Sequence, residues 1–187
     1  MDDPASPAAQ YILGNLWPNR EEPGFYSGVL AARLVQERLN QVLPTSRLSV
    51  VVEGRRQKGP FFIQGQAAAD QAIGEIGKIL DAVEAFKNTE VSAAEATRIQ
   101  DQWIEEFGKS FVSTDGICNV LLDSELYRLG SNYMSVFPDF VRRNNPTMIK
   151  EAAKNWLFPG GVVLIVRGPA QTLRPQLESL GMVQILK

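Results

Sequence analysis

The chain has 187 residues, of which 44% are apolar, enough to fill one sizeable hydrophobic core. Its formal charge is −2, with basic residues scattered among acidic ones, so it lacks the broad positive field that nucleic-acid binders and anionic-membrane binders need. The longest wholly apolar run, Val162 to Val166, is far shorter than the roughly 20 residues of a membrane span, so no transmembrane segment is predicted.

The counts of histidine and cysteine exclude several kinds of catalytic and metal site. The sequence contains no histidine, which excludes a Ser/His or Cys/His nucleophile pair, an imidazole base and the usual zinc sites that contain histidine. The single cysteine, Cys118, excludes an internal disulfide, and its apolar neighbours predict a buried structural thiol. Adjacent acids such as Glu21 and Glu22 are typical of a solvated surface. An independent hydrolase is therefore the least supported function.

The first elements follow a short N-terminal segment. Residues 1–9 are acidic and rich in proline and alanine, which predicts a linker or the boundary of an expressed fragment rather than a signal peptide. We expect residues 10–187 to form one domain. It begins with a strand over 10–17, and the apolar spacing from Phe25 onward predicts a helix that stops at Pro44.

The stretch LSVVVEGRRQKGPFFIQGQ, residues 48–66, predicts a hairpin of two antiparallel strands, 48–53 and 61–65, around a loop bounded by glycines. The loop carries Arg55, Arg56 and Lys58, so it is either a binding site or a plain turn. Charged loops ordinarily connect such strands, and the turn is therefore favoured from these residues alone.

Helices dominate the middle of the sequence. An amphipathic helix is predicted over 67–86, and Ser92 with Glu95 predicts a capping box that opens a second helix. A further helix, capped within 113–115 and ended by Gly130, carries apolar residues that we expect in the core: Ile117, Leu121, Leu126 and Leu129. Pro138 is predicted near the start of a short helix, and Asn145 is predicted to cap another that begins at Pro146.

The C-terminal part predicts a buried strand over 162–167, a helix over 170–180 and a last strand over 182–186. Hairpin strands mixed with long helices indicate an α+β fold. We expect a single two-layer sandwich, with a mostly antiparallel sheet that carries its helices on one face.

The order of these elements resembles one domain of the M16 zinc peptidases, the insulinase-like and processing-peptidase-like family. EVSAAEATRIQDQWIEEF and TDGICNVLLDSELYRLG are similar to two successive helices of that family. NPTMIKEAAKNWLFPGGVVLIVRGPAQTLRPQLESLGMV is similar to its recurring close, a helix, a strand and a helix that leads to "Leu-Gly-x-Val". In the family, a zinc domain with His-x-x-Glu-His faces a metal-free domain, and the two enclose a proteolytic chamber. Without histidine, this chain corresponds to the metal-free kind.

The resemblance implies a non-catalytic domain or subunit that pairs with a zinc-bearing M16 domain around a peptide substrate, with zinc only in the partner. It places Arg55, Arg56, Lys58 and Phe62 as candidate contacts to peptide or partner. The family's arginine and tyrosine positions fall near Pro44 and Val50, in the altered region LNQVLPTSRLSVVV, which favours shaping the chamber over contact with the scissile bond. The alternative is a scaffold of the same fold without any role in proteolysis. Periplasmic and cytoplasmic locations both stay open.

Overall fold

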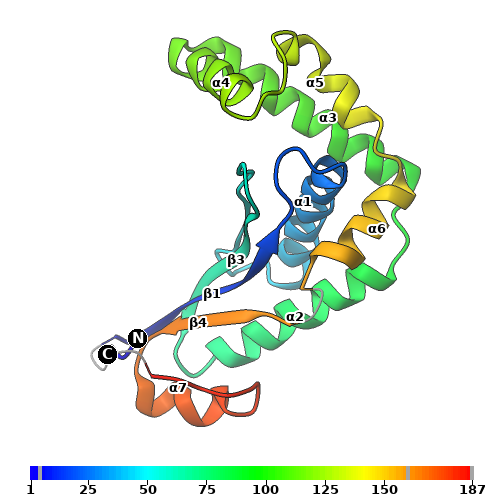
Figure 1. The fold of residues 1–187 in the computed structure, drawn as a ribbon. Coiled ribbons are helices and arrows are strands. Elements are labelled where there is room, and N and C mark those ends of the chain that lie inside the picture. Colours follow the sequence, from blue (N-terminus) through cyan, green and yellow to red (C-terminus); the bar gives the residue numbers. More distant parts are fainter. Residues whose placement is uncertain (4–5, 159–160, 186–187) are drawn as a thin grey trace.

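The computed structural model describes residues 1–3, 6–158 and 161–185, and these form an α+β domain, as predicted (Figure 1). The described residues contain one antiparallel sheet in the order β2-β3-β1-β4. Its strands are β1 (Ala8–Trp17), β2 (Ser49–Val52), β3 (Gly59–Ala68) and β4 (Val163–Arg167). The helices are α1 (Phe25–Val42), α2 (Ala72–Asn88), α3 (Ala93–Lys109), α4 (Thr114–Leu126), α5 (Tyr133–Arg142), α6 (Pro146–Trp156) and α7 (Ala170–Leu177), with a 3₁₀ turn η1 (Ser110–Val112).

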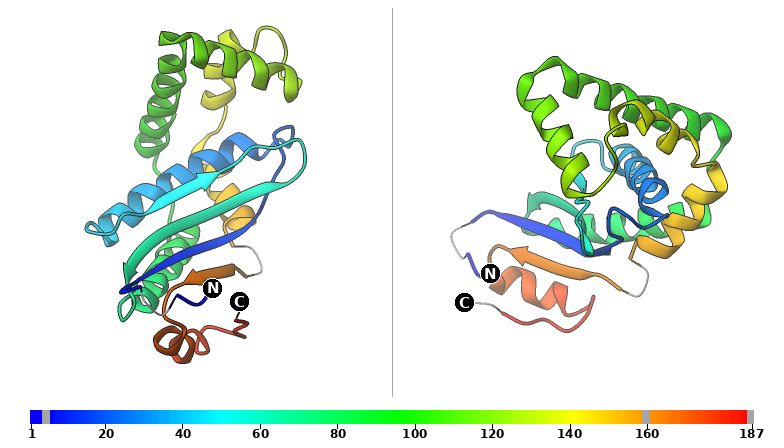
Figure 2. Two further views of the ribbon diagram at one scale, coloured as in Figure 1. Left: turned by 90° about the vertical axis from the view of Figure 1, so that its left-hand side faces the viewer. Right: turned by 45° about the horizontal axis from the view of Figure 1, so that its top comes forward.

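The helices of the described residues cover one face of the sheet, and none of them covers the other face (Figure 2). The left view of Figure 2 shows the strands in front, with α1 and α2 behind them. Alternate residues along β1 and β3 point toward these helices and are fully buried, because successive side chains of a strand face opposite ways. They include Tyr11, Leu13, Trp17, Phe61 and Ile63. The predicted two-layer arrangement is confirmed.

The predicted hairpin is also confirmed. β2 and β3 are antiparallel, with Val51 opposite Phe62. β3 continues to Ala68, because all ten of its residues pair with β1, where Ala8 lies opposite Ala68. For that reason α2 begins at Ala72, five residues later than the sequence indicates, and β1 begins two residues before the predicted strand.

A second group of helices packs beyond α1 through aromatic rings. The Phe107 ring of α3 stacks on the Phe137 ring of α5 with centroids 3.9 Å apart, and Trp103 meets Phe137 edge-on at 5.3 Å. Tyr26 of α1 contacts both Trp103 and Phe137. Such contacts add to the burial of apolar area, so this cluster holds α3 and α5 against α1.

The capping box at the start of α3 is confirmed. The Ser92 hydroxyl accepts a hydrogen bond from the Glu95 backbone N–H at 3.2 Å, and the Glu95 carboxylate accepts one from the Ser92 backbone N–H at 3.1 Å. The hydrogen bonds from Ser92 lower the pKa of the Glu95 carboxyl. The Asn145 side chain caps α6 by accepting a hydrogen bond from the Met148 backbone N–H at 3.0 Å, with Pro146 in the first turn, also as predicted.

The variant Ser92→Ala is expected to lower the free energy of unfolding by about 1 kcal/mol, because the Glu95 backbone N–H in the first turn of α3 loses its acceptor. Chemical denaturation followed by circular dichroism measures this loss. Ser92→Asp is the matched control, since it keeps a capping oxygen and should retain most of the stability. Equal losses in both variants would contradict a capping role.

Three sequence-based expectations are wrong. Pro138 lies in the middle of α5 rather than near its start. Tyr133, Phe137 and Val141 follow one another at four-residue steps and are all buried. Their packing outweighs the hydrogen bond that the proline cannot donate. Residues 182–185 form no strand, and Leu186 lies outside the described residues. The outer edge of β4 is instead met by the N-terminus, where the Met1 amine donates to Val166 O at 2.9 Å.

The third error concerns exposure. β4 is not a buried strand, since Val163 is 67% exposed and Ile165 is 51% exposed. Cys118 is exposed rather than buried. In the same helix, the apolar residues expected in the core lie largely on the surface, with Leu121 49% and Leu126 51% exposed. Apolar spacing indicates which side of an element is hydrophobic, but not whether another element covers that side.

Candidate functional site

The sheet face that carries no helices is the main candidate site, and we call it the open face. Its apolar members come from all four strands. Ile12 lies opposite Ile165, while Gly14 lies between Phe62 on β3 and Val163 on β4. Residues paired across a sheet point to the same side, so these side chains form one continuous surface. The apolar residues of the open face are Ile12, Leu16, Val51, Phe62, Val163 and Ile165.

The open face is exposed, although it is apolar. Leu16 is 67% exposed and Ile12 is 40% exposed, and Phe62 is half-buried among its strand neighbours. Polar side chains border the apolar part toward the far end of the sheet, where Gln10 lies opposite Gln66 and Ile12 opposite Gln64. A contiguous apolar surface with a polar rim is typical of a contact surface for another protein chain.

The structure separates the four predicted contact residues into two places. Phe62 lies within the open face, opposite Val51. Arg55, Arg56 and Lys58 lie at the exposed tip of the hairpin, at the edge of that face. The Arg55 guanidinium forms an ion pair with the Glu53 carboxylate of its own loop. Sequence reasoning therefore named one residue of the apolar surface and three residues of its rim.

Arg20 connects the hairpin tip to the helices through hydrogen bonds and cation–π contacts, and the sequence alone did not predict this role. Its backbone N–H donates to Arg55 O at 3.0 Å, and its guanidinium donates to the Tyr133 hydroxyl at 2.9 Å. The guanidinium also lies over the rings of Phe25 and Tyr127, at 5.1 Å and 5.4 Å. Cation–π contacts of this kind join segments distant in sequence, which a local motif search cannot find.

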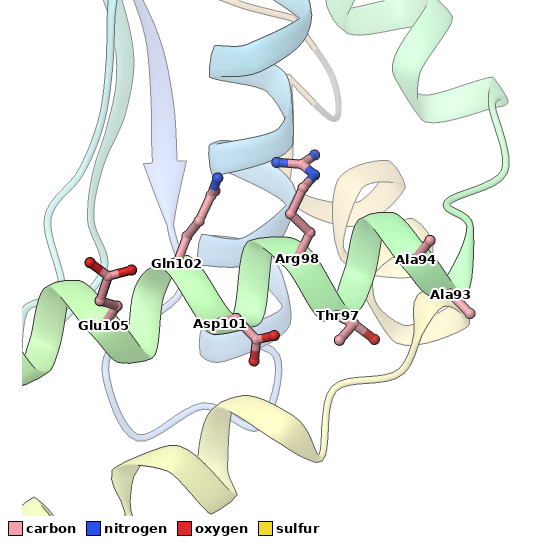
Figure 3. Close-up of a pocket in the computed structure, with 7 residues that line it drawn as sticks. All are labelled: Ala93, Ala94, Thr97, Arg98, Asp101, Gln102 and Glu105. Carbon is pink, nitrogen blue, oxygen red and sulfur yellow. The ribbon is translucent and has the colours of Figure 1, made fainter.

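A surface hollow on α3, drawn in Figure 3, is a weaker candidate. All seven labelled lining residues come from that one helix, so no second element closes the hollow. Arg98 points toward α1 and pairs with the Glu37 carboxylate, and Asp101 pairs with Arg142. With its charges already paired inside the protein, this helix surface is not built to hold a ligand.

The acidic side chains of the described residues are dispersed, and the two tyrosine hydroxyls with raised pKa values belong to the core. Within 1–3, 6–158 and 161–185, no group of three or more acidic or cysteine side chains is placed to hold a metal ion. Burial and a hydrogen bond to the Glu75 carboxylate raise the pKa of the Tyr11 hydroxyl, and burial and Tyr133 raise that of Tyr26. Both hydroxyls belong to the core and stay protonated. None of the described helices is long and apolar enough to cross a membrane.

No family model matches the sequence, and no curated protein matches it. Solved structures do share the fold. The M16 inactive domain from Pseudomonas fluorescens aligns with a TM-score of 0.77 at 18% identity over 88% of this chain and 41% of its own. The inactive peptidase domain of a proposed zinc protease from Bordetella parapertussis aligns with a TM-score of 0.71 at 16% identity, over 89% of this chain and 92% of its own.

A chain of complex III2 from Candida albicans aligns with a TM-score of 0.77 at 13% identity, over 97% of this chain and 48% of its own. This chain thus spans less than half the length of the Pseudomonas and Candida chains. Because the sequence identities are low, these comparisons show a shared fold and nothing finer. The resemblance of the sequence to M16 peptidases agrees with that fold. The chain has the fold of an M16 peptidase domain.

Proposed function

We propose that this chain is a non-catalytic M16-type domain or subunit, which pairs with a domain bearing His-x-x-Glu-His and helps to enclose a chamber for peptides. One observation carries the proposal: a chain without histidine has the same fold as structures named inactive M16 and zinc-protease domains. A metal-free domain of this fold can contribute shape and contacts, while the chemistry of peptide hydrolysis resides in its partner.

The open face supports this proposal as the surface turned toward the partner or the peptide. It is apolar at its centre and exposed, and no helix of the described residues covers it, as is typical of surfaces that associate with another chain. Arg55, Arg56 and Lys58 then lie at its rim, where they can attract acidic groups of a peptide. The family's arginine and tyrosine positions fall near Pro44 and Val50, with Arg38-Leu39 and Arg47-Leu48 as alternative matches to the family's Arg-Leu. Because this region is shorter and altered, the proposal gives the chain the role of shaping the chamber and leaves the scissile bond to the partner.

The proposal predicts that the purified chain binds no stoichiometric zinc and cleaves no peptide by itself. Structural zinc sites are built mainly from thiolates and imidazoles, and catalytic zinc sites usually include at least one imidazole, whereas this chain has no histidine and a single cysteine. Metal analysis of protein purified without chelator, together with a peptide-cleavage assay, measures both properties. One tightly bound zinc per chain, or cleavage that follows the protein through purification, would overturn this part of the proposal.

A second candidate function is a scaffold of the same fold that takes part in assembly without proteolysis. The likeness to a chain of complex III2 from Candida albicans favours this candidate, because that chain belongs to a large assembly. The two functions differ in their partner. The first requires a protein with His-x-x-Glu-His whose activity depends on this chain, and the second requires a complex whose formation involves no peptidase.

A further inference from the structure

Helix α4 carries a second exposed apolar surface, distinct from the open face. Its large side chains are far from buried: Ile117 is 37%, Leu121 49%, Leu122 66% and Leu126 51% exposed. Cys118, also exposed, lies between them. Ile117 and Leu121 are four residues apart, as are Cys118, Leu122 and Leu126, so they form two adjacent rows on one side of the helix. We call this surface the α4 stripe.

The rest of the protein holds α4 weakly. Val120 is the single buried residue of its 13, and the helix packs chiefly on the preceding turn η1. In Figure 1, α4 lies at the top left, at the periphery of the molecule. An isolated helix of this length is only marginally stable in water, and most helices gain stability by burying an apolar side. α4 presents its apolar side to solvent, which indicates that another chain packs against that side.

The charges of α4 indicate the chemistry of that other chain. The helix contains Asp115, Asp123 and Glu125 and no lysine or arginine, and none of these acids forms an ion pair among the described residues. Glu125 lies four residues after Leu121 and three after Leu122, so its carboxylate falls within the α4 stripe. Covering the stripe removes that carboxylate from water, which is costly unless a cation pairs with it.

We propose that the α4 stripe is a docking site for an amphipathic helix of a second protein, with apolar residues that cover Leu121 and Leu122 and a lysine or arginine that pairs with Glu125. A second copy of α4 would bring its own acids to the same place, and the helix itself contains no cation to pair with them. An anionic lipid surface would repel the three acids. The inference rests on α4 alone and holds whether or not the open face meets a zinc-bearing domain.

A pair of synthetic peptides tests this docking site on the full chain. One is an amphipathic helix of leucine and lysine, the other its counterpart of leucine and glutamate, and fluorescence anisotropy of a label on the peptide reports binding. The leucine/lysine peptide is expected to bind the wild-type chain at least tenfold more tightly than its counterpart. Hydrogen exchange of the α4 amides should slow on binding, because the helix gains the packing that it lacks alone.

Two variants test which residues of the α4 stripe contact the peptide. Leu122→Lys should weaken the leucine/lysine peptide about tenfold or more, the effect of losing one large apolar contact. Glu125→Lys should weaken that peptide and strengthen the leucine/glutamate peptide, so that the preference reverses. Val42→Lys is the matched control, since it places the same charge on an apolar residue that is 49% exposed at the end of α1, outside both apolar surfaces, and should leave both affinities unchanged. Circular dichroism confirms the fold of each variant.

Several results would overturn the proposal. If Leu122→Lys and Val42→Lys weaken the peptide equally, the peptide does not bind at the α4 stripe. If Glu125→Lys leaves the preference unreversed, the carboxylate does not select a basic partner. Sedimentation velocity that shows a dimer broken by Leu122→Lys would make a second copy the occupant, and Leu122-dependent binding to phosphatidylcholine vesicles would make lipid the occupant.

Discussion

Replacing Trp17 with alanine is expected to lower the free energy of unfolding by about 3–5 kcal/mol, the range for a large aromatic side chain removed from a packed core. Trp17 is 0% exposed, and its ring stacks on Phe61 with centroids 5.1 Å apart. It also lies against Gly28 of α1, where an added Cβ would come within 2.6 Å of the indole. The side chain therefore joins β1, β3 and α1, and alanine would leave a cavity among these three elements.

Guanidinium denaturation followed by circular dichroism measures this loss. Leu16→Ala is the matched control, because Leu16 is adjacent in sequence, 67% exposed and on the opposite side of β1, and its loss should stay within about 0.5 kcal/mol. The Trp17 indole N–H is buried without a hydrogen-bond partner, so the expected cost comes from packing alone. Similar losses for the two variants would contradict the assignment of inner and open faces of the sheet.

The second large effect is expected from Phe62→Asp, which should lower the activity of a zinc-bearing partner about tenfold or more when this chain is required for that activity. Phe62 lies between Gly14 and Val51, so aspartate there would put an unpaired carboxylate in the middle of the contact surface. The measurement is peptide cleavage by the reconstituted pair, with the fold of the variant checked by circular dichroism.

Ala94→Asp provides the control for that experiment. Ala94 is exposed in the first turn of α3, away from the open face, where an added carboxylate is tolerated or favourable. The control should therefore keep full activity. If Phe62→Asp and Ala94→Asp behave alike in a pair whose activity requires this chain, the open face is not the surface that meets the partner or its substrate.

Much of the fold could be predicted because its determinants are local. The glycine-bounded loop between two alternating runs specified the hairpin, the pair Ser92 and Glu95 specified the start of α3, and Asn145 specified the start of α6. The order of these elements specified the α+β class. Each signal lies within a few residues of the structure that it determines.

The errors arise where distant segments decide the outcome. β3 reaches Ala68 because β1 pairs with it along its whole length, and the sequence near Ala68 alone suggests a helix. The apolar side of α4 has the spacing of a core helix, yet no element of the described chain covers Leu122. In the candidate site, Phe62 and the basic tip could be named from the hairpin. Ile165 could not be assigned to the same surface from the sequence, because its position depends on the pairing of β4 with β1.

The most direct test of the central proposal is peptide cleavage by a His-x-x-Glu-His protein from the same genome, purified alone and after co-expression with this chain. We expect the two to form a complex with an interface larger than about 1,000 Å² in total, and cleavage to depend on this chain. Full activity of the zinc-bearing protein alone, with no complex on co-expression, would contradict the peptidase role and favour the scaffold.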